Sequence, residues 1–255
     1  MTKDWAKVFE TGFAAPGSAV QQRVWRAAFG SEYPEGVEPF SYVSRTELAR
    51  FSAEVMVEGT GHLVDVGCGR GGPGLWVAAQ TGAHLTGVDI AASALAAAKQ
   101  RARSLGLAAR AEFVRGTFES MPLDGGSVDA VMSVDALLFA PDKQAALAEL
   151  GRVLRHGGRL AFTSWDYKSE PAGRPPQVDD HRPLLVAAGF LVQAYDEAEC
   201  WHERHARVDA GLLAAVEELA AESGEDVEAV RANIEEMHAN LATMLRRVFV
   251  VAQTT

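Results

Sequence analysis

One glycine-rich turn constrains the fold of this chain more than any other feature. A short apolar run over residues 62–66 leads into a stretch with five glycines between residues 67 and 74, and apolar sequence resumes at Leu75. A buried strand that ends in such a turn and enters a helix is typical of a nucleotide-binding element, because glycines let the backbone bend tightly and let a ligand approach it closely. The helix start adds free N–H groups and a positive dipole end.

Two ligand classes fit this turn. Gly67, Gly69 and Gly72 satisfy the G-x-G-x-x-G pattern of dinucleotide sites, so NAD or FAD is one alternative. Asp89 closes the next apolar run, 20 residues after Gly69, where a carboxylate can accept hydrogen bonds from the ribose hydroxyls of either ligand. Asp65 favours the second class. Its charge would repel a pyrophosphate, whereas it could hold the α-ammonium of a cofactor that carries an amino acid.

With Asp65 included, the stretch V-D-V-G-C-G-R-G over 64–71 resembles the first motif of the class I S-adenosylmethionine-dependent methyltransferases. Asp89 matches the second acidic motif of that family. Residues 116–129 are similar to its G-D-x-x-x-L-P and S-F-D segment, with Thr117 in place of the aspartate, and residues 152–158 are similar to its R-V-L-K-P-G-G turn. The resemblance covers about residues 60–165 strongly and the final strands loosely, and the N-terminal helices and the cap lie outside it.

Apolar segments of strand and helix length alternate from residue 62 onward, which predicts a parallel sheet with helices on both faces. The resemblance implies an α/β, Rossmann-like, doubly wound sheet of seven strands with an antiparallel last strand. Residues 1–57 are expected to form an N-terminal helical lid, and residues 58–255 the methyltransferase core. Residues 203–245 are expected to be a helical cap insertion made of two helices.

Composition limits the partners. A net charge of −10 and an isoelectric point near 5.2 argue against a nucleic-acid groove or an anionic membrane surface. Cys68 and Cys200 form no disulfide framework, and His202 and His205 have no third ligand beside them, so no metal is expected. No signal peptide or membrane-spanning apolar run is evident, and we expect a cytoplasmic protein.

The resemblance and the strand ends together suggest site residues. Those expected to bind the cofactor are Asp65, Gly67, Cys68, Gly69, Asp89, Ile90, Thr117, Phe118, Ser133, Tyr42 and Arg45, the last through the cofactor carboxylate. Those expected around the substrate are Phe139, Trp165, Met237, Leu241 and Met244. The apolar stripes of the cap could equally pack on the sheet edge or form a homodimer interface.

Two residues are candidates for catalysis. Asp135 follows the fourth expected strand and either orients an acceptor hydroxyl or amine or holds the methionine part of the cofactor. His181 could act as a general base, although helix capping by the aspartates before it explains the cluster equally well.

The function implied by the resemblance is methyl transfer from S-adenosylmethionine, with S-adenosylhomocysteine as product, to an oxygen, nitrogen or carbon nucleophile of a small molecule. Such a direct displacement depends on positioning and desolvation. One alternative is a methyltransferase fold repurposed as a non-methylating enzyme or a binding protein. A second is an NAD-dependent oxidoreductase, which Asp65 and the turn at Gly157-Gly158 disfavour.

Overall fold

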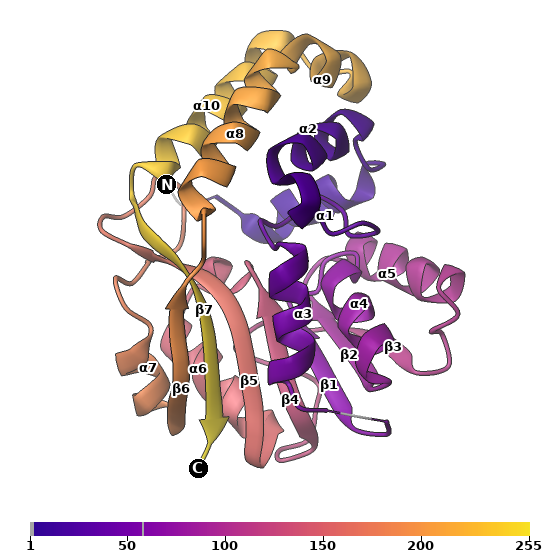
Figure 1. The fold of residues 1–255 in the computed structure, drawn as a ribbon, viewed down its shortest axis with the longest axis vertical. Coiled ribbons are helices and arrows are strands. Elements are labelled where there is room, and N and C mark those ends of the chain that lie inside the picture. The colour runs from indigo at the N-terminus through magenta and orange to yellow at the C-terminus, as the bar shows by residue number, and fades with distance from the viewer. Residues whose placement is uncertain (1–2, 58) are drawn as a thin grey trace.

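A computed structural model describes residues 3–57 and 59–255, and its centre is a seven-stranded sheet in the order β3-β2-β1-β4-β5-β7-β6 (Figure 1). The strands are β1 (His62–Val66), β2 (His84–Asp89), β3 (Ala111–Arg115), β4 (Val128–Val134), β5 (Leu154–Tyr167), β6 (Phe190–Glu197) and β7 (Met244–Thr254). The first five strands pair in parallel, whereas β7 runs antiparallel to both β5 and β6. The predicted fold class is confirmed.

Helices cover both faces of this sheet (Figure 1). One face carries α3 (Arg45–Glu54), α4 (Gly72–Thr81) and α5 (Ala92–Ser104), and the other carries α6 (Lys143–Val153) and α7 (Arg182–Ala187). Successive side chains of a strand point to opposite faces, so Leu63 of β1 joins the core under α3 while Val64 and Val66 join the core under α6. The carboxyl ends of the parallel strands are left free to build a site.

The remaining helices lie beyond those carboxyl ends (Figure 1). They are α1 (Trp5–Ala14), α2 (Ala19–Phe29), α8 (Trp201–Ala214), α9 (Val216–Ser223) and α10 (Val227–Leu241), with short 3-10 turns η1 (Gly30–Glu32) and η2 (Leu137–Phe139). Val24 and Trp25 of α2 share one apolar cluster with Val208 and Leu212 of α8. None of the helices within the described residues is both long and apolar enough to cross a bilayer.

The cap differs from the prediction in two details. It contains three helices, not two, because the chain turns at Ala215. After that turn, Val216 and Leu219 face the same apolar cluster as Leu212. Met244 does not continue the last cap helix but opens β7, where it pairs with Tyr167 of β5.

Candidate functional site

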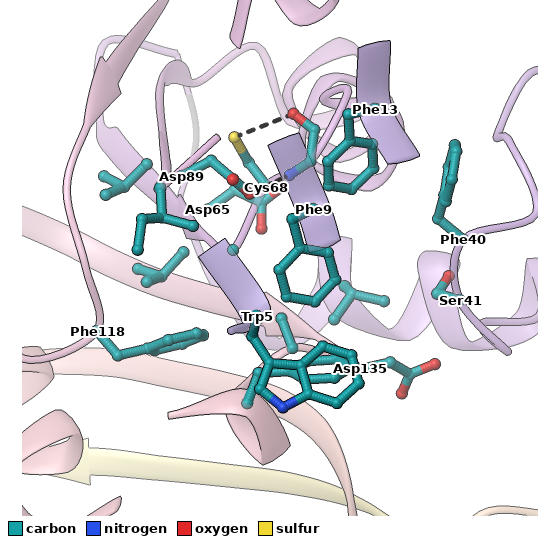
Figure 2. A pocket seen from close by; sticks show the side chains of 18 of the residues that line it. Trp5, Phe9, Phe13, Phe40, Ser41, Asp65, Cys68, Asp89, Phe118 and Asp135 are labelled. Atoms are coloured by element: carbon teal, nitrogen blue, oxygen red, sulfur yellow. Dashed lines mark hydrogen bonds between the residues drawn. The ribbon is translucent and has the colours of Figure 1, made fainter. Parts of the chain in front are cut away.

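A cavity of about 490 Å³ lies at the carboxyl ends of β1, β2 and β4 (Figure 2). Its walls come from the glycine turn, from the residues after β2, β3 and β4, and from the N-terminal segment. The structure brings these predicted residues together around the cavity: Asp65, Gly67, Cys68, Gly69, Asp89, Ile90, Thr117, Phe118, Asp135 and Phe139.

The glycine turn is held by backbone geometry that side chains would disturb. Gly67 and Gly69 have positive φ angles of 71° and 51°. A Cβ on Gly67 would stand 2.5 Å from the Cβ of Ala136, so no larger residue fits there without movement. The N–H groups of Gly67 and Cys68 donate to the carbonyl of Val88, at 2.8 and 3.1 Å, and so anchor the turn to the end of β2.

Asp89 is fixed at the edge of this turn. Its Oδ2 accepts from the Gly69 N–H at 2.8 Å and its Oδ1 from the Ala91 N–H at 2.9 Å. Burial raises the pKa of Asp89, and the two donated hydrogen bonds oppose that rise. Each carboxylate oxygen retains a second acceptor site. Asp89 can therefore accept hydroxyl groups from a ligand in the cavity.

Asp65 is the more unusual carboxylate. It is 1% exposed, and its Oδ2 has no hydrogen-bond partner within residues 3–57 and 59–255. Burial, followed by the nearby charge of Asp89, raises the pKa of Asp65 to about 7. A buried carboxylate without a partner is costly unless a donor or a cation reaches it. Asp65 therefore fits the ammonium group of an amino-acid-bearing ligand.

Aromatic side chains of the N-terminal segment close the other side of the cavity. Figure 2 shows Trp5, Phe9 and Phe13 of α1, with Phe40, across from Asp65 and Asp89. These rings contact one another, with 5.7 Å between the centroids of Trp5 and Phe9 and 4.9 Å between those of Phe13 and Phe40. The aromatic spacing in the sequence was consistent with this role but did not distinguish it from ordinary core packing.

Polar contacts fasten α1 to the turn and to α5. Arg70, in the glycine turn, donates through Nη2 to the carbonyls of Phe13, at 2.9 Å, and of Ala15. The Glu10 carboxylate accepts from the Ala92 N–H at 2.7 Å, at the start of α5. Sequence reasoning missed Arg70 and Glu10, because no local pattern shows which distant backbone groups they meet.

Asp135 lies at the cavity with its carboxylate already engaged. Its Oδ1 accepts from the Thr163 hydroxyl at 2.7 Å and from Arg247 Nη2 at 2.9 Å, and its Oδ2 accepts from the Tyr42 N–H at 2.7 Å. Asp135 also adopts a positive φ of 52°, which these contacts hold in place. The arrangement favours a positioning role, and a direct catalytic role stays a prediction.

Several predicted residues lie away from the cavity wall. Arg45 is exposed at the start of α3, while the ring of Tyr42 stacks on that of His205, with 3.4 Å between centroids. The Ser133 hydroxyl donates to the carbonyl of Val66 at 2.9 Å. His181 is fully buried, with Nδ1 2.9 Å from Asp166 Oδ1. The structure does not bring these side chains to the ligand space.

The predicted substrate residues are split. Phe139 lines the cavity, whereas Trp165, Leu241 and Met244 form a buried cluster that Phe139 borders. Met237 is only partly buried in α10. Their contact with an acceptor stays a prediction.

Comparison with known proteins agrees with this geometry. Residues 64–162, which include the glycine turn, Asp89 and the strands up to β5, match the family model described as a methyltransferase domain. Over these residues the chain is similar to the methyltransferase domain family. The matched region supplies most of the residues that line the cavity.

Curated relatives of this chain align over part of their length. Methyltransferase GfsG of Streptomyces halstedii is 31% identical over 129 residues, which are 51% of this chain and 46% of that protein. Sterol 24-C-methyltransferase ERG6B of Gibberella zeae is 38% identical over 103 residues, which are 40% of this chain and 27% of that protein. The aligned region thus spans less than half of either relative.

A solved structure extends the similarity to nearly the whole chain. The cyclase SpnF superposes with a TM-score of 0.73, over 94% of this chain and 98% of that chain, at 22% identity. At this identity the match shows a shared fold alone. The N-terminal helices and the cap therefore belong to an arrangement that another protein also has.

Proposed function

We propose that the protein transfers a methyl group from S-adenosylmethionine to an oxygen, nitrogen or carbon nucleophile of a small molecule. The observation that carries this proposal is the pair of buried carboxylates, Asp65 and Asp89, on either side of the glycine turn in a methyltransferase domain. A cofactor with both an ammonium group and ribose hydroxyls suits this pair, whereas a pyrophosphate does not. When bound, S-adenosylmethionine supplies an activated methyl group on a sulfonium.

The residues that would hold the cofactor follow from the cavity. Asp89 accepts the ribose hydroxyls, and Asp65 accepts the ammonium group through its unpartnered Oδ2. Thr117 and Phe118 line the adenine side. The Thr117 oxygen accepts from the Ser120 N–H at 3.1 Å, so its own hydroxyl hydrogen is available to a ligand.

The chain's contribution to the reaction is to align the two reactants and to exclude water from them. Residues 1–57 act as a lid whose aromatic side chains cover the cavity, and residues 203–245 cap the carboxyl ends of the strands. Holding two reactants in line accounts for about 7–11 kcal/mol of a barrier. An acceptor with a nucleophile of low pKa then needs no protein base, which is compatible with the engaged carboxylate of Asp135.

The alternative is a methyltransferase fold used for another reaction. The cyclase SpnF has a similar fold, so the experiments must also test this alternative. It predicts the same cofactor-binding residues but no methyl transfer. Binding and turnover must therefore be measured separately.

Calorimetry with S-adenosylhomocysteine and with NAD tests the cofactor first. We expect S-adenosylhomocysteine to bind and NAD not to bind; the reverse would contradict the proposal. A screen of small nucleophiles with methyl-labelled S-adenosylmethionine then tests turnover. Cofactor binding without transfer to any acceptor would support the repurposed fold.

A further inference from the structure

Unpartnered polar atoms gather in the interior between the cavity and the cap. Within residues 3–57 and 59–255, side-chain atoms of this region that are buried without a hydrogen-bond partner are Trp165 Nε1, Tyr167 Oη, Arg174 Nη1, Gln177 Oε1 and His205 Nε2. They come from the end of β5, the loop that follows it, and α8. Buried polar atoms in folded proteins nearly always have hydrogen-bond partners. A local group of exceptions therefore points to partners supplied by a bound molecule.

Arg174 is the charged member of this group. Its guanidinium carbon lies 5.0 Å from the ring centroid of Trp5 and 4.7 Å from that of Phe139. No carboxylate of the described residues forms an ion pair with it, and Glu236 pairs instead with Lys3 at 2.6 Å. Burial lowers the pKa of Arg174, yet an arginine remains charged at neutral pH.

The arginines that are more deeply buried, Arg247 and Arg70, are neutralised by the chain itself. Arg247 pairs with Asp135 at 2.9 Å and also with Glu47, and Arg70 pairs with Glu38 at 3.2 Å. Arg174 is thus a partly buried cation that stacks on aromatic rings and has no ion-pair partner among residues 3–57 and 59–255. A guanidinium presents a planar fork of donors that matches the oxygens of a carboxylate or a phosphate.

Arg174 and Tyr167 are not among the residues that line the cavity, but Arg174 covers two aromatic rings that do line it. Trp5 and Phe139, whose rings it covers, both line the cavity, as do its chain neighbours Pro175 and Pro176. Trp5 belongs to α1, a helix in which no residue is fully buried, and its indole N–H donates to the Gly173 carbonyl at 3.2 Å, next to Arg174 in the chain. Phe139 lies in η2, the 3-10 turn that follows β4, and lines the same cavity as Asp135.

We propose that Arg174 binds an anionic group, a carboxylate or a phosphate, of the methyl acceptor, with the Tyr167 hydroxyl as a second donor. The acceptor is then a small organic anion with an apolar part that packs against Trp5 and Phe139. This inference rests on the proposed methyltransferase function and names the substrate class of that site. The competing account is that Arg174 only holds the lid closed through its cation–π contacts.

The test uses the full chain saturated with S-adenosylhomocysteine and three probes: benzoate, phenyl phosphate and neutral benzyl alcohol. We expect calorimetry to show binding of at least one anion and none of benzyl alcohol, and the anion that binds distinguishes a carboxylate from a phosphate. Arg174→Gln should weaken anion binding by tenfold or more and leave the affinity for S-adenosylhomocysteine unchanged. Arg174→Lys, which keeps the charge but loses the fork, should show a smaller loss.

Arg182→Gln is the matched control. Arg182 also covers an aromatic ring, that of Tyr195 at 4.9 Å, but it is exposed and pairs with Asp180. Its replacement should change no binding constant. Tyr167→Phe should weaken anion binding by a few fold.

Three results would overturn the inference: anion affinity unchanged in Arg174→Gln, benzyl alcohol binding as well as benzoate, or no probe binding to the loaded wild type. Loss of S-adenosylhomocysteine affinity in Arg174→Gln would support the lid contact instead. Failure of the wild type to bind S-adenosylhomocysteine at all would contradict the proposed function, and is read before any anion is added.

Discussion

Asp135 and Arg247 form a buried ion pair beside the cavity, with 2.9 Å between Oδ1 and Nη2. The two residues are 112 positions apart in the chain, and their side chains are 2% and 1% exposed. Arg247 also binds Glu47 of α3, while Asp135 accepts the N–H of Tyr42. One ion network therefore joins the end of β4, β7 and the N-terminal segment.

Replacing Arg247 by methionine should lower the free energy of unfolding by about 3–5 kcal/mol, because two carboxylates would remain buried without their cation. Urea denaturation measures this loss. Arg23→Met is the control, since Arg23 makes an exposed pair with Glu218. Its loss should be about 0–1 kcal/mol. Equal losses in the two variants would contradict the importance of the buried network.

Replacing Asp89 by alanine should weaken S-adenosylhomocysteine binding by about 1.5–3 kcal/mol, the scale of a hydrogen bond to a charged group. Calorimetry measures the change, and Asp124→Ala, at an exposed carboxylate, serves as control. Normal affinity in Asp89→Ala would show that the ribose assignment is wrong.

Because burial raises the pKa of Asp65 to about 7, we expect cofactor binding to depend on pH. An ammonium group needs the ionised carboxylate, so affinity for S-adenosylhomocysteine should rise as pH increases toward about 7 and level off above it. The stability of the ligand-free protein should change in the opposite sense. Because the folded state holds this proton at a higher pKa than the unfolded chain, the contribution of Asp65 to stability falls as pH rises from about 4 to 7.

Asp65→Asn should remove both effects. The measurements are calorimetric affinities and urea midpoints at several pH values. A wild-type affinity that does not vary with pH, or one that varies identically in Asp65→Asn, would exclude the ammonium assignment.

Replacing Arg70 by glutamine should loosen the lid, because the carbonyls of Phe13 and Ala15 lose their donor. Hydrogen bonds of this kind contribute about 0.5–1.5 kcal/mol each, so S-adenosylhomocysteine should dissociate roughly tenfold faster. Stopped-flow fluorescence follows the dissociation. Arg103→Gln, at an exposed position of α5, should behave as wild type. An unchanged rate in Arg70→Gln would argue that α1 does not gate the cavity.

Variants in the cap test whether its apolar residues contact the acceptor or only pack in the interior. Leu241 is buried beside Trp165, so Leu241→Ala should destabilise the protein by about 2–5 kcal/mol. If Met237 and Leu241 roof the acceptor, their joint replacement by alanine raises the acceptor KM and leaves cofactor affinity unchanged. Equal losses in both would indicate packing alone, and a change to monomers with unchanged kinetics would indicate a dimer interface.

Much of the fold and the cofactor side of the cavity was accessible from the sequence. The glycine turn, the strand and helix alternation and the spacing between Gly69 and Asp89 are local patterns, and each is decided by residues within one or two elements. The predicted fold class is confirmed, and residues 64–162 match the methyltransferase domain that the motifs indicate. Strand boundaries depend on pairing with distant strands, as in β5, whose 14 residues from Leu154 to Tyr167 pair with β4 and β7.

The long-range ion pairs could not be predicted from the sequence. The sequence places Asp135 after a strand, but only the antiparallel register of β5 and β7 brings Arg247 to it. His181 follows two aspartates in the chain, yet it is buried against Asp166, which lies on β5. Local patterns carry no information on such partners, because each depends on how distant strands align.

The sequence by itself therefore determined where a nucleotide-like cofactor meets this chain, since strand, turn and carboxylates lie close together along it. Only the tertiary structure decided what covers that cofactor and what faces the acceptor. An apolar stripe shows that a helix face is buried but not against which element. Folding set α1 over the glycine turn, packed the cap on α2, and placed Arg174 against the rings of Trp5 and Phe139.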